Sequence, residues 1–450
     1  MGKYFGTDGI RAVAGTFPLT DEFIEKLGWC ALDELKKSAQ ARGLKNQVII
    51  AQDSRASGPA ILAALQKGIR AAGVNVVSIG VAPTPAVANI VRQTGSLCGI
   101  VISASHNPAE FNGIKFFTNH GSKLPETMEA AIETRIDGCS AVPAPRADYC
   151  EDLSLVELYK NFLKSTVDAA LLKGTKIVLD CANGASSQIA VDVFSALGME
   201  LTVTGAKPDG TNINRGVGAL HTQFMQDLTK REGAFAGFSF DGDADRVIAS
   251  DEQGRQLDGD NIIASSALCL KQEGRLHAGK AVLTIMANLG CINYLKEHGV
   301  DVVLTKVGDK YVSEAMEKED LSIGGETSGH IIFREFSNTG DGLLSALQFL
   351  QCVKKSGKPM SWFLDQWKKY PSLLRAVQVS SKPALETLDG FLPGVAELEK
   401  QMNGRGRVIV RYSGTEPKFR ILVEGEDSAL VSHIAGEVEK LYRAKTEVLA

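Results

Sequence analysis

Residues 99–108 read Gly-Ile-Val-Ile-Ser-Ala-Ser-His-Asn-Pro. The first half is a short apolar run typical of a buried strand, and it ends abruptly in small and polar residues. Ser105, His106 and Asn107 therefore place a hydroxyl, an imidazole and an amide together at the end of a strand. Open α/β sheets carry their reactive groups at that position. This stretch indicates an α/β protein with a reactive serine at Ser105.

A serine flanked by a histidine and a lysine suits phosphoryl transfer. Lys115 lies in the apolar stretch 112–117, which we expect to be a second strand that returns the ammonium group toward Ser105. Acyl transfer is disfavoured because the Gly-x-Ser-x-Gly elbow is absent. The alternative for an isolated Ser-His-Asn-Pro is a turn serine whose hydroxyl caps a backbone N–H.

Length and composition describe an ordinary enzyme of several domains. The 450 residues are 44% hydrophobic and 23% charged, and 45 glycines against 14 prolines favour many tight turns between strands and helices. The net charge of −4 comes from interspersed charges, so we expect neither nucleic acid nor an anionic membrane as a partner. Without a signal core or a membrane-spanning apolar run, the chain is predicted to be cytoplasmic. The eight cysteines show no metal-binding spacing and are expected to be free thiols.

Three segments look alike and predict a repeated unit. The apolar runs 48–51, 177–179 and 281–284 each lead into a small polar turn and then a helical pattern. Three such starts, spaced by about a domain length, indicate three related α/β domains. Before the first of them, residues 21–42 show helical periodicity, with Phe23, Leu27, Ala31 and Leu35 on one face.

Domain boundaries are expected where this pattern lapses. Residues 138–149 contain two prolines and read as a linker, a second break follows residue 254, and a third surrounds Pro371. The composition then changes to that of a smaller α+β unit. The predicted domains are 1–147, 148–252, 253–368 and 369–450.

The strongest single motif is Asp241-Gly-Asp-Ala-Asp-Arg246. Three carboxylates at every second position fall on one side of an extended backbone, and such crowding is costly unless a cation lies among them. An all-oxygen site that also accepts a phosphate oxygen suits Mg²⁺. A calcium EF-hand is disfavoured because Arg246 stands where that loop needs glycine, and the preceding residues read as a strand.

Two further loops suit a phosphorylated sugar. In Gly324-Gly-Glu-Thr-Ser-Gly-His330, Glu326 and Ser328 can point together at vicinal sugar hydroxyls. Residues 408–420 run from a strand into a loop in which Ser413 and Thr415 can cradle phosphate oxygens between Arg411 and Arg420. The alternative for each loop is a solvated turn, as it is for residues 306–310 and 339–342.

Taken together, these motifs carry a family resemblance. Ser-Ala-Ser-His-Asn-Pro, Asp-Gly-Asp-Ala-Asp-Arg, Gly-Glu-Thr-Ser-Gly-His and Arg-Tyr-Ser-Gly-Thr-Glu-Pro occur in this order and span nearly the whole chain. In this the sequence resembles the α-D-phosphohexomutase superfamily. The opening Phe-Gly-Thr-Asp-Gly-Ile-Arg, residues 305–309 and residues 339–343 are most similar to its bacterial phosphoglucosamine mutase branch.

The resemblance implies a heart-shaped, four-domain isomerase, with three related mixed α/β domains and a smaller α+β domain at the C-terminus. It implies a phosphoserine at Ser105, one Mg²⁺ ion per chain, a bisphosphosugar as primer and intermediate, a phosphosugar substrate and a homodimer. The implied metal ligands are Ser105, Asp241, Asp243 and Asp245. The implied catalytic residues are Arg11, Ser105, His106, Lys115, Arg246 and His330. The implied substrate-binding residues are Lys306, Gly308, Asp309, Glu326, Ser328, Arg411, Ser413, Gly414, Thr415 and Arg420.

One residue departs from the pattern of that branch. Thr327 stands where the branch usually has Gln and where the neighbouring phosphomannomutase/phosphoglucomutase branch usually has Met. The resemblance predicts interconversion of glucosamine 6-phosphate and glucosamine 1-phosphate, which supplies UDP-N-acetylglucosamine synthesis. The alternatives are a phosphomannomutase or phosphoglucomutase with the same mechanism, a Mg²⁺-dependent sugar phosphatase, and a catalytically silent sugar-phosphate-binding protein.

Overall fold

The computed structural model describes residues 2–39, 43–413 and 417–447. Their strands form sheets of six, five, four and three strands. The chain divides into two compact units. The first unit contains Met1–Met286 and Gly299–Gln366, and the second contains Ala287–His298 and Trp367–Ala450.

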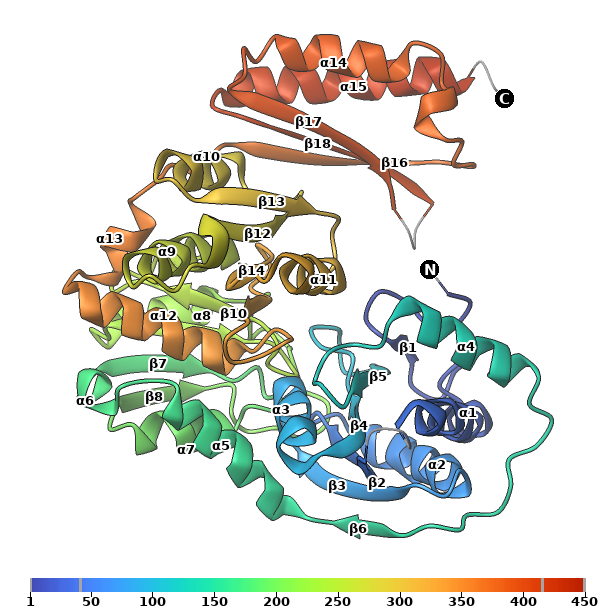
Figure 1. The fold of residues 1–450 in the computed structure, drawn as a ribbon. Coiled ribbons are helices and arrows are strands. Elements are labelled where there is room, and N and C mark those ends of the chain that lie inside the picture. The colour runs from blue at the N-terminus through green and yellow to red at the C-terminus, as the bar shows by residue number, and fades with distance from the viewer. Residues whose placement is uncertain (1, 40–42, 414–416, 448–450) are drawn as a thin grey trace. The chain divides into compact units, whose positions relative to one another are not determined.

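The first sheet has the strand order β1-β5-β4-β2-β3-β6 (Figure 1). Its strands are β1 (Ile10–Val13), β2 (Lys45–Gln52), β3 (Asn75–Val81), β4 (Ser96–Ile102), β5 (Phe111–Thr118) and β6 (Tyr149–Glu151). The accompanying helices are α1 (Asp21–Ala39), α2 (Gly58–Ala71), α3 (Thr84–Thr94) and α4 (Glu126–Asp137). The face of α1 predicted from periodicity is buried, whereas residues 40–42 of the predicted helix lie outside the described residues.

The second sheet has the order β11-β10-β9-β7-β8. Its strands are β7 (Lys176–Asp180), β8 (Glu200–Thr204), β9 (Ala236–Phe240), β10 (Val247–Ser250) and β11 (Gln256–Leu257). The helices of this region are α5 (Val156–Ser165), α6 (Ala169–Leu172), α7 (Ile189–Ala196) and α8 (Gln223–Arg231). Because β10 and β11 form an antiparallel hairpin, the boundary expected after residue 252 falls inside its turn.

The third sheet has the order β13-β12-β14-β15. Its strands are β12 (Lys280–Thr284), β13 (Asp301–Thr305), β14 (Ile323–Gly325) and β15 (Ile331–Phe333). The helices of this region are α9 (Gly259–Gln272), α11 (Asp309–Glu319), α12 (Gly342–Ser356) and α13 (Met360–Leu364).

The first three sheets share one plan. In each sheet, two neighbouring parallel strands (β2 and β3, β7 and β8, β12 and β13) are joined by a third parallel strand (β4, β9 or β14). An antiparallel strand (β5, β10 or β15) follows that third strand. The runs predicted to start the repeats are β2, β7 and β12, which occupy the same place in each sheet. The prediction of three related α/β domains is confirmed.

This shared plan positions the predicted site loops. The loop with Ser105 follows β4, the acidic loop follows β9, and the loop with Glu326 follows β14. Each loop is the turn from the third parallel strand to the antiparallel strand of its sheet. Three segments far apart in the sequence therefore occupy equivalent places, at the carboxyl ends of equivalent strands.

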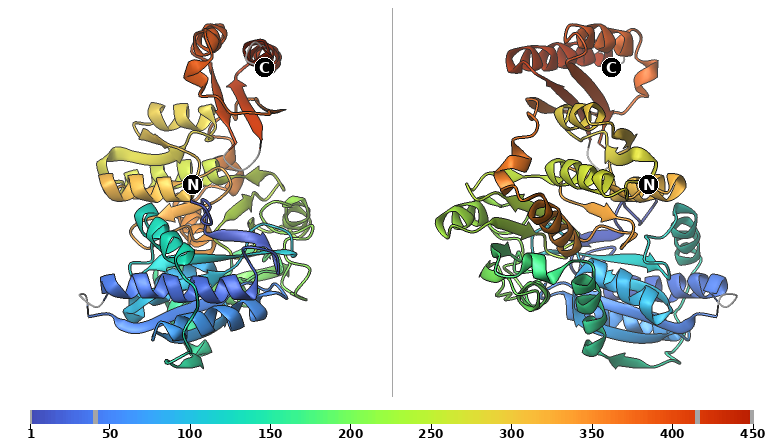
Figure 2. Two further views of the ribbon diagram at one scale, coloured as in Figure 1. Left: turned by 90° about the vertical axis from the view of Figure 1, so that its right-hand side faces the viewer. Right: turned by 60° about the vertical axis from the view of Figure 1, so that its left-hand side comes forward.

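The second unit is built on the fourth sheet, with the order β16-β18-β17. Its elements are β16 (Ser372–Gln378), α14 (Phe391–Lys400), β17 (Gly406–Tyr412), β18 (Lys418–Gly425) and α15 (Ser428–Glu447). Helices α14 and α15 lie side by side on one face of this sheet (Figures 1 and 2). Phe419 of β18 stacks on Tyr442 of α15 at 3.8 Å between ring centroids, within a core of its own.

Segment 287–298, with helix α10 (Leu289–Glu297), belongs to this second unit. The Asn288 side chain donates to Glu424 Oε1 at 2.7 Å and to the Tyr370 carbonyl at 3.1 Å. The Tyr370 N–H donates back to Asn288 Oδ1 at 2.9 Å. These bonds hold the chain next to Pro371, where the sequence predicts a domain boundary.

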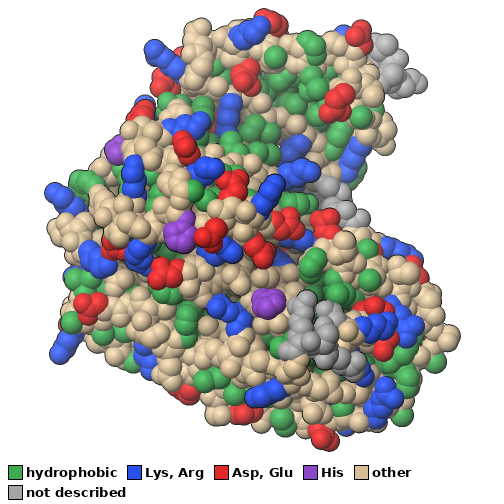
Figure 3. Space-filling view, viewed as in Figure 1, with side chains coloured by type: hydrophobic (Ala, Val, Ile, Leu, Met, Phe, Trp, Pro, Cys, Tyr) green, Lys and Arg blue, Asp and Glu red, His purple; other side chains and the backbone are tan. Residues whose placement is uncertain are grey.

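The mixed charges on the surface and the free cysteines are as the composition predicts. Acidic and basic side chains are interspersed on the face that Figure 3 shows. All eight cysteines are free thiols. Within the described residues, no helix is both long enough and apolar enough to cross a bilayer.

Candidate active site

Ser105 lies just beyond the end of β4 in a conformation that is rare for serine. Its φ is 53°, in the left-handed region, and only 1% of the residue is exposed. Its hydroxyl donates to Asp241 Oδ2 at 2.6 Å, which joins the loop of the first sheet to the acidic loop of the second. A left-handed residue other than glycine costs about 1–3 kcal/mol and persists only when its surroundings enforce it.

Two side chains that the sequence analysis missed hold this loop. Arg55 Nη2 donates to the carbonyls of Ser105 at 3.0 Å and Asn107 at 2.8 Å. Asn214 Nδ2 also donates to the Ser105 carbonyl, at 2.9 Å. The backbone of Gly242 packs against the same carbonyl, because a Cβ on Gly242 would lie 2.5 Å from that oxygen. Residues from the loops of the first and the second sheet therefore together fix the conformation of Ser105.

Asp241, Asp243 and Asp245 do converge, but not through strand alternation. They lie in a turn after β9 in which Ala244 adopts a φ of 55°. One ligand oxygen from each carboxylate lies within 4.8 Å of the others, and all three residues are buried. The expectation of an extended backbone was wrong, because a left-handed residue reverses the chain and gathers the three side chains instead.

The oxygens of this triad fit a hard divalent cation. Among the described residues, Asp243 Oδ1 and Asp245 Oδ1 are buried without a hydrogen-bond partner. Orphaned buried carboxylate oxygens are costly, and a cation with oxygen ligands would satisfy them. The donor set fits Mg²⁺.

Lys115 lies on β5 and points at the carboxylates rather than at the serine hydroxyl. Its Nζ is 2.7 Å from Asp243, 3.2 Å from Asp245 and 2.9 Å from Asp8. Burial disfavours the ammonium, but the three carboxylates outweigh burial and raise the pKa of Lys115 well above its usual value. The lysine is a permanent positive charge among buried acids.

The surroundings shift the pKa values of Asp241 and Asp243 in opposite directions. Burial, followed by the charges of Asp245 and Asp243, raises the pKa of Asp241 well above its usual value. For Asp243, burial acts in the same direction, but the Lys115 ammonium outweighs it and lowers the pKa to about 2. The repulsion among the three carboxylates therefore disfavours mainly the ionised form of Asp241. This is the carboxylate that receives the Ser105 hydrogen bond.

The other predicted catalytic residues gather around this centre. Arg11 lies on β1 opposite Gly113 of β5 and pairs with Asp8. The Arg246 N–H donates to Asp241 Oδ1 at 3.2 Å. His106 Nδ1 is 3.3 Å from the Ser105 hydroxyl, and burial, aided by the charges of Arg246 and Arg11, lowers the pKa of His106 to about 4. The sequence analysis missed Asp8, although it lies in the quoted opening motif.

In and near the loop after β14, some of the predicted side chains make hydrogen bonds within the protein and others are exposed. Glu326 Oε1 accepts from the Gly308 N–H at 3.0 Å, which joins the predicted sugar loop to the start of α11. Ser328 and Lys306 are exposed. The Thr327 hydroxyl donates to Asp260 Oδ1 at 2.8 Å, so its side chain is engaged with the start of α9.

His330 and Asp309 form a buried pair in the same unit. His330 forms a backbone bridge with Arg246, which places it beside the acidic loop. Its Nε2 lies 3.2 Å from Asp309 Oδ2. Asp309, predicted to bind substrate, thus has its carboxylate against another predicted site residue.

The predicted phosphate-binding residues lie in the second unit. Arg411 of β17 is directly opposite Arg420 of β18, and burial together with the Arg420 charge lowers the pKa of Arg411. The Ser413 N–H donates to the Lys418 carbonyl at 2.8 Å, which keeps the ends of the two strands together. Gly414 and Thr415 lie outside the described residues. Paired guanidinium groups favour an anionic ligand.

Family models cover nearly the whole chain. Three models of phosphoglucomutase/phosphomannomutase α/β/α domains match it: domain I at residues 2–141, domain II at 156–254 and domain III at 258–370. The model of the phosphoglucomutase/phosphomannomutase C-terminal domain matches residues 371–441. The chain belongs to the phosphoglucomutase/phosphomannomutase family of phosphohexomutases.

Two relatives of this chain are phosphoglucosamine mutases. The phosphoglucosamine mutase of Geobacillus kaustophilus is 43% identical, over 98% of this chain and 99% of the relative. That of Caldicellulosiruptor saccharolyticus is 42% identical, over 99% of this chain and the whole relative. The resemblance seen in the motifs is confirmed.

Solved structures agree in fold. A phosphoglucomutase/phosphomannomutase family protein from Burkholderia thailandensis has a TM-score of 0.80 at 22% identity and covers 99% of this chain and 98% of its own. The Aspergillus fumigatus N-acetylphosphoglucosamine mutase, solved in complex with GlcNAc-6P and magnesium, has a TM-score of 0.65 at 18% identity and covers 98% of this chain and 96% of its own.

Proposed function

We propose that this enzyme interconverts glucosamine 6-phosphate and glucosamine 1-phosphate through a phosphorylated Ser105. The observation that carries the proposal is the 2.6 Å hydrogen bond from the Ser105 hydroxyl to Asp241, at the edge of a buried carboxylate triad. A serine held among acids and cations suits the transfer of a phosphoryl group whose charge must be balanced. The phosphoglucosamine mutases at 42–43% identity support the choice of sugar.

Mg²⁺ would be held by Asp241, Asp243 and Asp245 and, in the phosphorylated enzyme, by the group on Ser105. When bound, it supplies positive charge that stabilises the phosphoryl oxygens. The orphaned oxygens of Asp243 and Asp245 support this assignment.

The chain's own residues supply the remaining charge balance. Lys115 offsets the acids and keeps its proton, since three carboxylates raise its pKa. Arg246 and Arg11 add two guanidinium groups beside the serine loop, and both of their Nε atoms are buried without a hydrogen-bond partner among the described residues. These groups are available to phosphoryl oxygens, which arginine binds in a planar, two-pronged geometry.

The reaction needs two phosphoryl transfers, one from Ser105 to the sugar and one from the sugar back to Ser105. In the first, the bond from phosphorus to Ser105 Oγ breaks, a bond from phosphorus to the free sugar hydroxyl forms, and that hydroxyl loses its proton to a nearby base. The product is the 1,6-bisphosphate. After it turns over, Ser105 takes the other phosphoryl group by the same step in reverse.

Substrate binding uses two regions. Glu326, held by the Gly308 N–H, and Ser328 would bind the sugar hydroxyls. Arg411, Ser413, Gly414, Thr415 and Arg420 would bind the phosphate that is not being transferred. The bisphosphate must reorient between the two transfers, so the phosphate-binding residues have to release it. A hinge near Pro371 would allow this release.

The test is isomerisation of the 6-phosphates of glucosamine, glucose and mannose, each with Mg²⁺ and a trace of bisphosphosugar. The proposal expects a preference for glucosamine 6-phosphate that Ser105→Ala abolishes. A preference for glucose or mannose would retain the mechanism and change the pathway. Release of inorganic phosphate without isomerisation would indicate a phosphatase and contradict the proposal.

A further inference from the structure

His330 is buried and held from its edge. Only 3% of the residue is exposed, and its Nε2 lies 3.2 Å from Asp309 Oδ2. An imidazole this deeply buried needs a polar partner, because burying an unpaired polar group is costly. Asp309, the first residue of α11, supplies that partner.

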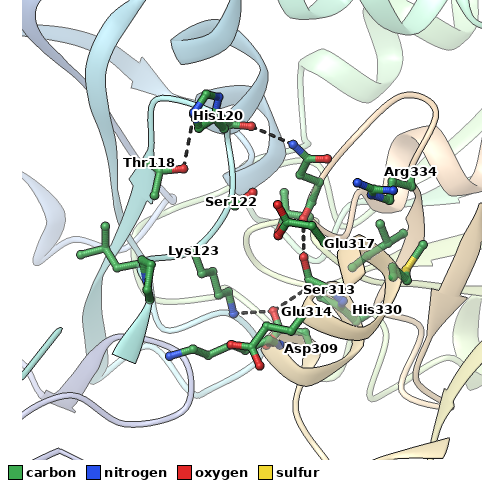
Figure 4. Close-up of a pocket in the computed structure, with 17 residues that line it drawn as sticks. Thr118, His120, Ser122, Lys123, Asp309, Ser313, Glu314, Glu317, His330 and Arg334 are labelled. Carbon is green, nitrogen blue, oxygen red and sulfur yellow. Dashed lines mark hydrogen bonds and ion pairs between the residues drawn. The ribbon is translucent and has the colours of Figure 1, made fainter. Parts of the chain in front are cut away.

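The carboxylate of Asp309 is fully engaged inside the protein. Its Oδ1 accepts from the Lys310 N–H at 2.9 Å, while Oδ2 faces both His330 and the ammonium of Lys123. Figure 4 shows Lys123 and Asp309 joined at one end of a pocket that His330 also lines. With both oxygens engaged, Asp309 is poorly placed to bind substrate, the role that the family resemblance implies.

This pair is connected to the carboxylate triad. Lys123 also pairs with Asp8, and Asp8 pairs with Lys115, whose ammonium lies against the triad. Charges of alternating sign therefore run from the acidic loop to His330. Burial works against a charged His330, but the Asp309 carboxylate outweighs it and raises the pKa of His330; Asp245 acts in the same direction and Lys123 opposes it.

Gly340 holds the imidazole from its flat side. A Cβ on Gly340 would lie 2.4, 2.5 and 2.6 Å from Nε2, Cε1 and Cδ2 of His330. Nearly equal distances to three ring atoms mean that Gly340 lies over the ring plane, where only glycine fits. The neighbouring Gly342 N–H donates to the Ala244 carbonyl at 3.0 Å, which ties the same segment to the acidic loop.

The two ring nitrogens of His330 differ in their neighbours. Among the described residues, neither nitrogen makes a hydrogen bond, but Nε2 has the Asp309 carboxylate at ion-pair distance, whereas Nδ1 has no such partner. A carboxylate at one nitrogen of a histidine sets which way the ring faces and which nitrogen reaches the substrate.

We propose that Asp309 is a positioning residue that acts through His330: with Gly340 against the ring, it directs Nδ1 of His330 toward the transferring group. The inference rests on the proposed function and assigns Asp309 to orientation rather than to sugar binding. It also gives a role to the Thr-Gly-Asp-Gly segment 339–342, which from the sequence alone could be taken for a turn.

The test is a double-mutant cycle on the mutase reaction in the full-length enzyme with Mg²⁺. Asp309→Asn should lower kcat by about 10- to 100-fold with little change in KM, as the loss of a group that orients a histidine does. In a His330→Gln background the same change should cost nothing further, because its effect passes through the ring. Glu319→Gln, at the exposed far end of the same helix and outside this pocket, is the matched control and should match the wild type.

Gly340→Ala provides an independent variant that keeps the carboxylate. It should lower kcat in the same way and should also be silent in the His330→Gln background. Losses that multiply, or a raised KM with unchanged kcat in Asp309→Asn, would overturn the inference and assign Asp309 to substrate binding. A wild type that does not isomerise any phosphosugar would overturn the proposed function itself, so the two failures are distinguishable.

Discussion

Replacing Asp241 with asparagine should stabilise the metal-free protein, although it removes a group of the candidate metal site. Asp241 is fully buried, and its ligand oxygen lies within 4.8 Å of those of Asp243 and Asp245. At that distance, and at the effective dielectric constant of about 20 that suits protein sites, each like-charged pair repels by about 3.5 kcal/mol. Asparagine removes this repulsion and keeps an oxygen that can accept from Ser105.

The substitution also removes two favourable interactions with Arg246, and their loss reduces the gain in the free energy of unfolding. The Arg246 N–H donates to Asp241 Oδ1 at 3.2 Å, and an amide nitrogen there cannot accept it, at a cost of about 1–3 kcal/mol. The attraction of the Arg246 guanidinium is also lost. We therefore expect a net gain of about 1–3 kcal/mol in the free energy of unfolding without metal.

The assay is thermal unfolding of wild type and Asp241→Asn, in EDTA and in Mg²⁺. In EDTA the variant should melt at the higher temperature. In Mg²⁺ the wild type should gain about 4.1 kcal/mol at a metal concentration about one thousand times Kd, whereas the variant should gain little, so the order reverses.

Asp251→Asn is the matched control. Asp251 is equally buried and accepts from the N–H groups of Gln253 at 3.0 Å and Arg255 at 2.7 Å, outside the triad. Its substitution should destabilise the protein in both conditions, by about 1–3 kcal/mol. If Asp241→Asn proves less stable than wild type in EDTA, or responds to Mg²⁺ as wild type does, the electrostatic reasoning is refuted.

Three further substitutions probe the site. Ser105→Ala should leave most of the Mg²⁺-induced thermal shift but prevent phosphorylation by glucose 1,6-bisphosphate, as intact mass spectrometry would reveal; a variant that still gains a phosphoryl group would exclude Ser105 as the acceptor. Lys115→Met should destabilise the metal-free protein by about 3–5 kcal/mol, opposite in sign to the aspartate change, because it leaves buried carboxylates without their cation; a variant as stable as wild type in EDTA would contradict this. Thr327→Gln should change the ratio of kcat/KM for glucosamine and glucose phosphates by less than about threefold, since Thr327 binds Asp260; a tenfold change would show that the residue selects the sugar.

The repeated α/β architecture was predictable because its signals are local. An apolar run followed by a polar turn marks β2, β7 and β12 in the sequence itself, and the periodicity of residues 21–42 marks α1. The approximate position of each site loop follows from the same patterns. The order of the motifs, which no single motif provides, then indicated the resemblance to phosphohexomutases.

The contacts that complete the site were not predictable because they join distant segments. Asn214 and Arg55 hold the Ser105 loop from 109 and 50 residues away along the chain. Neither residue lies in a sequence motif that indicates this contact. The turn through Ala244 replaced the expected extended backbone because a left-handed φ leaves no sign in an alanine. The family resemblance assigned Asp309 to substrate binding, whereas its contact with His330 depends on how α11 lies beside the sheet.

The most direct measurement follows a radiolabelled phosphoryl group on Ser105. The enzyme is first labelled with glucose 1,6-bisphosphate, freed of small molecules and then mixed with unlabelled glucosamine 6-phosphate and Mg²⁺. The mechanism predicts that the label moves from the protein to the sugar within a few turnovers and appears in both bisphosphate and glucosamine monophosphates. Label that stays on the protein while isomerisation proceeds, or that leaves as inorganic phosphate, would contradict the role of Ser105 as the carrier.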